Sequence, residues 1–212
     1  MKAERSKKIK IVLIAAAAVL AAIAIMYVLP FGLLFYSVAS AKVEEYNDIS
    51  HYSEYMTFDE SVAKWTKWGM DETIWPKKIT DDMKVADFKM VYYNPWDAQY
   101  LGYLVVDYPA KEYDAEVKRL REYPSTDYVG YYSVKEEKTY DLLAVNADEY
   151  QGFVYALTDG KGRIIYAEQI FCNYLMDLDY EKYIPKEYLL DGFDATEGNP
   201  YKKEKLKKIE HL

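Results

Sequence analysis

The fold of this chain is decided by residues 85–108, which read VADFKMVYYNPWDAQYLGYLVVDY. The runs 85–93 and 100–108 are alternating, β-branched and aromatic, which is typical of strands. Between them residues 94–98 hold a proline and polar side chains, as the loop of a β-hairpin does. Because so short a connection joins antiparallel neighbours, this stretch predicts the first hairpin of an antiparallel sheet.

Downstream of the hairpin the sequence predicts one helix and four more strands. Residues 111–122 form a charged amphipathic pattern with Tyr113, Val117 and Leu120 on its buried stripe. The strands are expected at 127–134, 140–146, 152–158 and 163–171, with turns at 136–138, 147–151 and 159–162. The last turn contains Gly160 and Gly162, which tolerate the positive φ of tight turns.

Upstream of the hairpin, Thr57 and Glu60 form a capping box at the start of a helical pattern that Gly69 is placed to end. A helix is therefore expected over 57–69, and residues 37–56 are expected to be a membrane-proximal connector. Together these elements predict an α+β domain over 57–190. It has a mainly antiparallel, meandering sheet of about six strands with two or three helices on one face.

The segment 11–41 contains 31 residues without a charge. A helix of about 20 apolar residues spans the hydrocarbon core of a bilayer. Residues 11–36 are therefore predicted to be a transmembrane anchor, with 11–29 as the best span. Pro30 and Gly32 are expected to weaken the helix near its exit.

Charges on the two sides of the apolar segment predict its orientation. Residues 1–10 carry five Lys and Arg against one Glu, whereas Glu44, Glu45 and Asp48 follow the span. An excess of basic residues marks the cytoplasmic side, so we expect a cytoplasmic stub at 1–10 and an extracytoplasmic domain on the cell membrane. The alternative is a signal peptide cleaved after Ala41, although its apolar part would be nearly twice the usual length.

The composition of the exported part narrows its partners. Cys172 is the only cysteine, so the domain must fold without an intrachain disulfide. Residues 42–212 contain 22 basic and 34 acidic residues, a net charge of −12. Such a surface disfavours nucleic acid and leaves cations, cationic peptides and neutral ligands as partners.

The residue inventory does not predict a catalytic site. The two histidines, His51 and His211, lie in the connector and next to the last residue, so neither a His-based triad nor a zinc site is indicated. Cys172 is expected to be a packing residue, and no catalytic residue or cofactor is predicted. Asp177, Asp179 and Glu181 could ligate Ca²⁺ from one face of an extended segment; the alternative is a solvated acidic edge.

Tyrosine is the strongest lead to a binding site, because 24 of the 212 residues are Tyr. Tyr has a high strand propensity, so sheet packing explains many of them. A cluster on a solvent-facing side of the sheet would instead form a platform for a peptide, protein or glycan. The candidate binding residues are Trp96, Tyr93, Tyr103, Tyr131 and Tyr132.

The C-terminal part is less regular. Residues 177–190 are expected to hold a short helix broken at Ile184 and Pro185, and 191–212 to form a basic tail. As a helix, 201–212 could lie on an anionic membrane surface or cell-wall polymer. The alternative, which we favour, is a solvated segment that frays.

The pattern of residues along the chain resembles that of one group of proteins. The run 87–96, the helix with Glu112, Tyr113 and Arg119, and the strand 152–156 look like small single-pass envelope proteins of Gram-positive, clostridia-type bacteria. Those carry an N-terminal anchor and one Tyr-rich exported domain. The resemblance implies a bacterial surface protein and no particular catalytic residue.

Two classes of function follow from these observations. The first is a tethered binding domain that acts through an acidic, tyrosine-rich surface; an immunity or inhibitor protein that neutralises a basic partner is one form of it. The second is an envelope hydrolase that uses carboxylates alone.

Overall fold

The computed structural model describes residues 2–136 and 140–210, and the chain divides into two compact units, Met1–Lys42 and Val43–Leu212. Most of the turn predicted at 136–138, and His211, lie outside the described residues.

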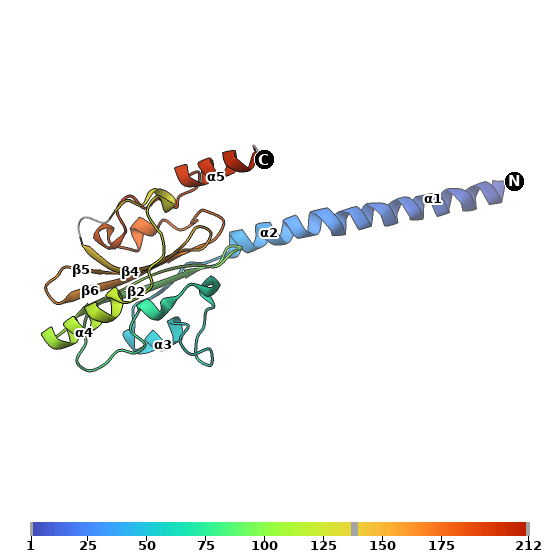
Figure 1. Cartoon of the computed structure of the whole chain (residues 1–212). Helices are drawn as coiled ribbons and strands as arrows, with labels where there is room; N and C mark the ends of the chain where they lie inside the picture. Colours follow the sequence, from blue (N-terminus) through green and yellow to red (C-terminus); the bar gives the residue numbers. More distant parts are fainter. Residues whose placement is uncertain (1, 137–139, 211–212) are drawn as a thin grey trace. The chain divides into compact units, whose positions relative to one another are not determined.

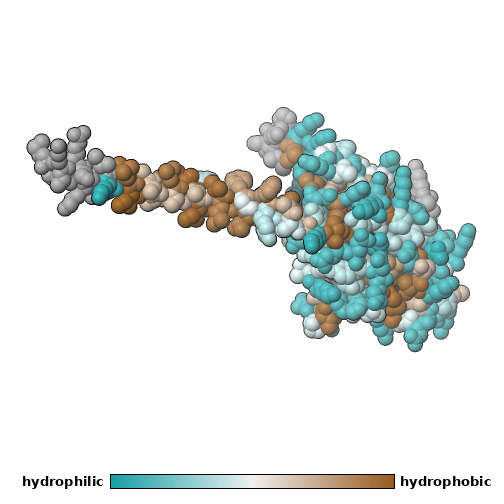
Figure 2. Space-filling view, turned by 180° about the vertical axis from the view of Figure 1, so that it is seen from behind, coloured by the Kyte–Doolittle hydropathy of each residue, from teal (hydrophilic) through white to brown (hydrophobic). Residues whose placement is uncertain are grey.

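The first unit is helical throughout. It comprises α1 (Lys2–Ile23), a π-helical turn η1 (Ala24–Val28) and α2 (Leu29–Ser40). Pro30 has no amide hydrogen for the carbonyl one turn earlier, and the wider turn lies just before it. The helix continues past Pro30, so Val12–Ser40 is a helical segment of 29 residues that is long and apolar enough to cross a membrane. A signal sequence can have the same length and composition. Figure 2 shows hydrophobic side chains along this helix.

The second unit is built on a six-stranded antiparallel sheet, which confirms the predicted α+β class. The strands are β1 (Glu44–Tyr46), β2 (Lys84–Tyr93), β3 (Gln99–Asp107), β4 (Asp141–Asp148), β5 (Gly152–Thr158) and β6 (Arg163–Ile170). Their order is β1-β2-β3-β6-β5-β4. The strands β4, β5 and β6 form a meander that returns β6 beside β3, and α4 (Ala110–Arg121) lies in the long connection from β3 to β4.

One predicted strand does not form. Residues 127–134 contain the 3-10 turn η5 (Tyr131–Ser133), in which Tyr132 and Ser133 have φ of 49° and 65°. Left-handed backbone cannot continue an extended strand, so the strand predicted over 127–134 was wrong. The sixth strand is β1, which pairs Glu44–Tyr46 with the outer side of β2.

The expected boundaries also change at the start of the domain. The connector predicted over 37–56 is regular structure instead: α2 runs to Ser40, and β1, η2 (Ile49–His51) and α3 (Tyr52–Tyr55) follow. Tyr52, Tyr55 and Met56 are buried in the core. The helix predicted over 57–69 is absent; the chain there makes turns and then η3 (Lys67–Gly69) and η4 (Glu72–Ile74). The Thr57 hydroxyl, expected to cap that helix, donates to Glu72 instead.

Both faces of the sheet are covered, whereas helices were expected on one. On the first, here called the α4 face, α3, α4 and the chain up to residue 77 pack on Phe88, Leu104 and Tyr166. The opposite α5 face is covered by η5, η6 (Tyr180–Lys182), η7 (Lys186–Tyr188) and α5 (Pro200–Glu210). Figure 1 shows α3 and α4 on one side of the sheet and the segment after β6 on the other.

The two 3-10 turns η6 and η7 lie on either side of residues 184–185, where the break was predicted. The helix predicted at 111–122 is α4, shifted by one residue at each end.

Candidate functional site

The five candidate aromatic residues do not share one exposed surface. Trp96 is 63% exposed in the loop between β2 and β3, and Tyr93 is partly buried. Tyr103 and Tyr132 are 5% and 0% exposed, because the α5 face that should have been open is covered. Tyr131 is partly buried.

Tyr131 and Tyr132 nevertheless belong to a surface group of rings, here called the tyrosine cluster. Its members are Tyr131, Tyr132, Tyr150, Tyr174 and Tyr201. The Tyr201 ring centroid lies 5.8 Å, 4.8 Å and 5.9 Å from those of Tyr131, Tyr132 and Tyr174, and Tyr150 lies 4.9 Å from Tyr174. Tyr150 is 51% exposed and every member except Tyr132 reaches the surface. Four separate segments therefore build one aromatic surface.

The backbone that carries these rings is strained. Tyr132, Ser133, Asn173 and Tyr174 all have positive φ, between 49° and 65°. A non-glycine residue in this region costs about 1–2 kcal/mol, and such residues gather at functional sites. Two of the five rings of the tyrosine cluster thus stand on left-handed residues that the surrounding fold must hold.

A cation already lies on the tyrosine cluster. Lys205 of α5 pairs with Glu149, and its Nζ lies 5.5 Å from the centroid of the Tyr201 ring. The Tyr201 hydroxyl donates to the same Glu149 carboxylate at 3.0 Å. The hydrogen bond from Lys205 lowers the pKa of Glu149 and keeps this carboxylate charged. An aromatic face beside a carboxylate is a site for an ammonium group.

A second polar centre lies inside the α4 face. Lys67, Glu72 and Glu168, here called the buried triad, have fully buried side chains. The Lys67 ammonium pairs with Glu72 and lies 2.8 Å from Glu168 Oε1. Glu72 Oε2 accepts from the Thr57 amide at 2.7 Å and from its hydroxyl at 2.6 Å. The triad joins a loop to the central strand β6.

The two carboxyls of the buried triad have opposite pKa shifts. Burial, with the neighbouring Glu72, raises the pKa of Glu168 to about 8 despite Lys67. Burial also opposes ionisation of Glu72, but the Lys67 ammonium and the hydrogen bonds outweigh it and lower its pKa. At neutral pH Glu72 is therefore the carboxylate and Glu168 the neutral acid.

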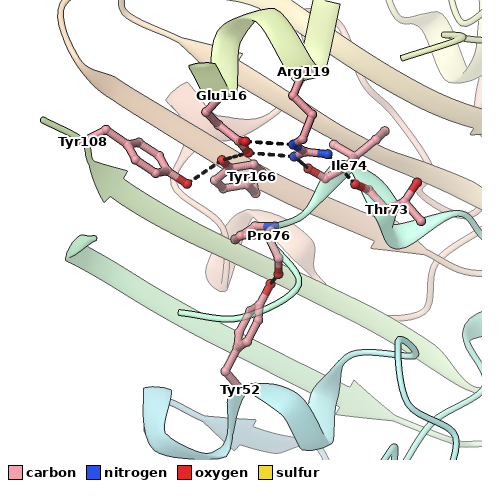
Figure 3. A network of polar contacts seen from close by, with 8 residues as sticks. All are labelled: Tyr52, Thr73, Ile74, Pro76, Tyr108, Glu116, Arg119 and Tyr166. Carbon is pink, nitrogen blue, oxygen red and sulfur yellow. Dashed lines mark hydrogen bonds and ion pairs between the residues drawn. The ribbon is translucent and has the colours of Figure 1, made fainter. Parts of the chain in front are cut away.

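The segment that supplies Lys67 and Glu72, residues 65–77, is here called the strap. Lys67, Trp68 and Gly69 at its start have φ of 46°, 55° and 75°. Its far half is clamped, as Figure 3 shows: Arg119 donates to the carbonyls of Thr73 and Ile74, both at 2.7 Å.

Further contacts in Figure 3 fix this clamp to the sheet. Glu116 accepts from Arg119 at 2.7 Å and from the Tyr166 hydroxyl at 2.6 Å, and Tyr166 bonds Tyr108 at 2.8 Å. The Tyr52 hydroxyl donates to the carbonyl of Pro76 at 2.6 Å. A hollow of about 490 Å³ lies beside the strap, and Thr57, Glu72 and Lys77 are among its lining residues.

The predicted calcium ligands do not converge. Asp177 accepts from the Gln99 side chain at 2.5 Å, Asp179 precedes η6, and Glu181 lines a separate hollow of about 570 Å³. Within residues 2–136 and 140–210, no group of three or more His, Cys, Asp or Glu could hold a metal ion. Cys172 is half-buried rather than fully packed, and burial together with Asp97 raises its pKa to about 12.

Sequence reasoning missed the buried triad. One signal was available, because Glu168 occupies the same face of its strand as Ile164, Tyr166 and Ile170. A carboxyl on an otherwise apolar face needs a buried partner. The identity of that partner, about 100 residues away along the chain, had no local signal.

Comparison with known proteins adds no assignment, since no family model, curated protein or solved structure matches the chain.

Proposed function

We propose that this chain is a membrane-tethered, extracytoplasmic binding domain that recognises a basic segment of a protein or peptide through the tyrosine cluster. The observation that carries the proposal is Lys205, whose ammonium group lies over the Tyr201 ring and pairs with Glu149. An ammonium from a partner would find the same two contacts. An immunity or inhibitor protein that neutralises a basic partner would use this surface in the same way.

Charge and residue type support the same reading. The net charge of −12 on residues 42–212 attracts a basic partner and speeds encounter. Tyr side chains supply rigid contact area and lose little rotamer entropy on binding. Tyr150 is the most exposed member of the tyrosine cluster and is therefore the first ring a partner meets.

The binding experiment titrates the full chain in detergent with a hexalysine peptide. We expect binding that weakens with salt and that Tyr150→Ala reduces at least about fivefold, as a contact residue of a hot spot does. Trp96→Ala is the matched control, because Trp96 is at least as exposed as Tyr150 but lies outside the tyrosine cluster. An unchanged affinity in Tyr150→Ala, or a preference for a neutral chitooligosaccharide over hexalysine, would contradict the proposal.

A second variant tests whether the position of the Lys205 ammonium is the binding site. Lys205→Met removes the resident ammonium and should tighten hexalysine binding, since the peptide no longer competes with α5. Lys208→Met is the control, because Lys208 pairs with Glu204 along the same helix. Equal affinities in the two variants would show that Lys205 does not occupy the binding site.

The tether is the second part of the proposal. The apolar helix Val12–Ser40 supports an uncleaved anchor, and the basic residues before it support a cytoplasmic N-terminus on a bacterial envelope. Trypsin added to intact cells should then digest the domain, whereas protection would reverse the orientation. The intact mass of the membrane-extracted chain distinguishes a retained anchor from cleavage after Ala41.

A further inference from the structure

We propose that the buried triad is a self-processing site: after folding, Lys67 Nζ condenses with the side-chain carboxyl of Glu72, assisted by Glu168, to form an intramolecular amide cross-link. The proposal is independent of the binding function and rests on four features of the triad.

The first feature is the proximity of buried side chains. The side chains of Lys67, Glu72 and Glu168 are fully buried, and the ammonium touches both carboxyls. A nucleophile held against its acceptor reacts as though at very high concentration. In water, hydration of the ammonium and the carboxylate opposes their condensation; burial removes that hydration.

The second feature selects Glu72 as the acceptor. Its Oε2 receives two donors from Thr57, the amide at 2.7 Å and the hydroxyl at 2.6 Å. These donors are placed to stabilise the oxygen of a tetrahedral intermediate, as an oxyanion hole does. Glu168 contacts Lys67 and Glu72 within the triad, and among the described residues its carboxyl has no pair of donors like those of Thr57.

The third feature gives Glu168 the part of proton carrier. It lies 2.8 Å from the Lys67 Nζ, and its raised pKa keeps it protonated at neutral pH. A neutral acid can donate to a departing oxygen and then accept from the nitrogen.

The fourth feature is the space that holds Glu168. Gly102 faces it from β3, and a Cβ on Gly102 would lie 2.4 Å from Met90 Sδ and 3.3 Å from Glu168 Cγ. A side chain at position 102 would therefore crowd the triad, and glycine leaves room for it.

The reaction balances without any outside reagent. In an unfavourable pre-equilibrium, against the raised pKa of Lys67 and the lowered pKa of Glu72, the Lys67 ammonium transfers one proton to the Glu72 carboxylate. The small neutral fraction of the amine then attacks Glu72 Cδ to form the C–N bond. Glu168 donates its proton to the hydroxyl on Cδ, the C–O bond breaks, and water leaves. Glu168 then recovers a proton from the nitrogen. One ammonium and one carboxylate become one amide and one water, with no change in oxidation state.

Mass spectrometry of the full chain tests the proposal. We expect an intact mass lower than the sequence mass by one water, retained in denaturant. Trypsin should cleave after Lys64 and Lys77 but not after Lys67, giving peptide 65–77 with one water missing and no fragments that separate 67 from 72. A folded chain of full mass that trypsin cleaves after Lys67, or a bond from Lys67 to Glu168, would overturn it.

Variants keep the test independent of folding defects. Lys67→Arg and Glu168→Gln should restore the full mass. Glu72→Gln should lose ammonia in place of water, a signature that misfolding cannot imitate, and loss of water in this variant would contradict the mechanism. Lys64→Arg, which alters a partly exposed ion pair with Glu54, is the matched control and should keep the loss of one water.

Discussion

Both faces of the sheet carry non-glycine residues in left-handed backbone, but these residues bury a polar group on one face and place aromatic rings near the surface on the other. On the α4 face, Lys67 and Trp68 in left-handed backbone turn an ammonium inward to meet two carboxyls. On the α5 face, Tyr132, Ser133, Asn173 and Tyr174 in the same conformation gather phenol rings near the surface. Backbone strain alone therefore does not determine whether the side chains that it positions are buried or accessible to solvent.

What differs between the faces is the cover. The strap over the buried triad is clamped by Arg119 and Tyr52, whose hydrogen bonds end on strap carbonyls. The tyrosine cluster is only partly covered: Tyr132 is fully buried, Lys205 of α5 pairs with Glu149 beside the Tyr201 ring, and Tyr150 stays exposed. A clamped cover excludes water and strengthens charges beneath it, whereas an edge contact leaves rings available to a partner.

The largest contrast should come from removing one ammonium on each face. Measured against chain that has not formed the Lys67–Glu72 amide, Lys67→Met leaves the Glu72 carboxylate buried without its cation and should lower the free energy of unfolding by about 3–5 kcal/mol. Lys205→Met breaks a partly exposed pair and should change it by only about 0–1 kcal/mol. Urea unfolding of the full chain measures both. Similar losses in the two variants would mean that the faces do not differ in solvation.

The pH dependence should have opposite signs on the two faces. Because the folded pKa of Glu168 is raised to about 8, the folded state holds an extra proton, and this stabilisation is lost as pH rises toward 8. The pKa of Glu149 is lowered, so its contribution is present at neutral pH and lost in acid. Unfolding free energies measured across pH should show that Glu168→Gln flattens the decline from about pH 5 to 8. Glu149→Gln should alter only the acid limb; a flattened neutral range in this variant would contradict the assignment.

A smaller contrast should come from deleting one hydroxyl on each face. Tyr166→Phe removes the donor to Glu116 and the bond to Tyr108, inside the α4 face, and should cost about 1–3 kcal/mol. Tyr150→Phe, at the exposed edge of the tyrosine cluster, should stay within about 0.5 kcal/mol. Thermal unfolding compares the two, and a large loss in Tyr150→Phe would show that the tyrosine cluster is structural.

The smallest effect should come from relieving the strain itself. Ser133→Gly places the residue that favours positive φ at φ 65° and should stabilise the domain by about 0.5–1 kcal/mol. Asn173→Gly should be nearly neutral, because Asn visits this region more readily than Ser. A loss of stability in Ser133→Gly would mean that the Ser side chain contributes more than its backbone strain costs.

The regular elements with a clear period were predictable. The hairpin at 85–108, the strands at 140–146, 152–158 and 163–171, and the helix at 111–122 all formed within a few residues of the expected bounds. Each is specified by neighbouring side chains in a period of 2 or 3.6.

Failures occurred where a side chain had a competing distant partner. Thr57 has the residue type and spacing of a helix cap, yet its amide and hydroxyl donate to Glu72, and residues 57–66 make turns instead of the predicted helix. The run 127–134 reads as a strand, but Gly130, Tyr132 and Ser133 adopt positive φ and the run turns. Local patterns cannot weigh such alternatives, because the competing bonds come from elsewhere in the chain.

By itself the sequence determined a long apolar helix, an antiparallel sheet with α4 beside it, and a strongly acidic domain, since each depends on residues near one another or on composition alone. Only the tertiary structure decided that both sheet faces are covered, that Lys67 meets Glu168, and that Tyr131, Tyr150, Tyr174 and Tyr201 lie together with Tyr132. The physical reason is that burial and contact between distant segments depend on strand register and on what packs over each face, and neither is written in any local stretch of the chain.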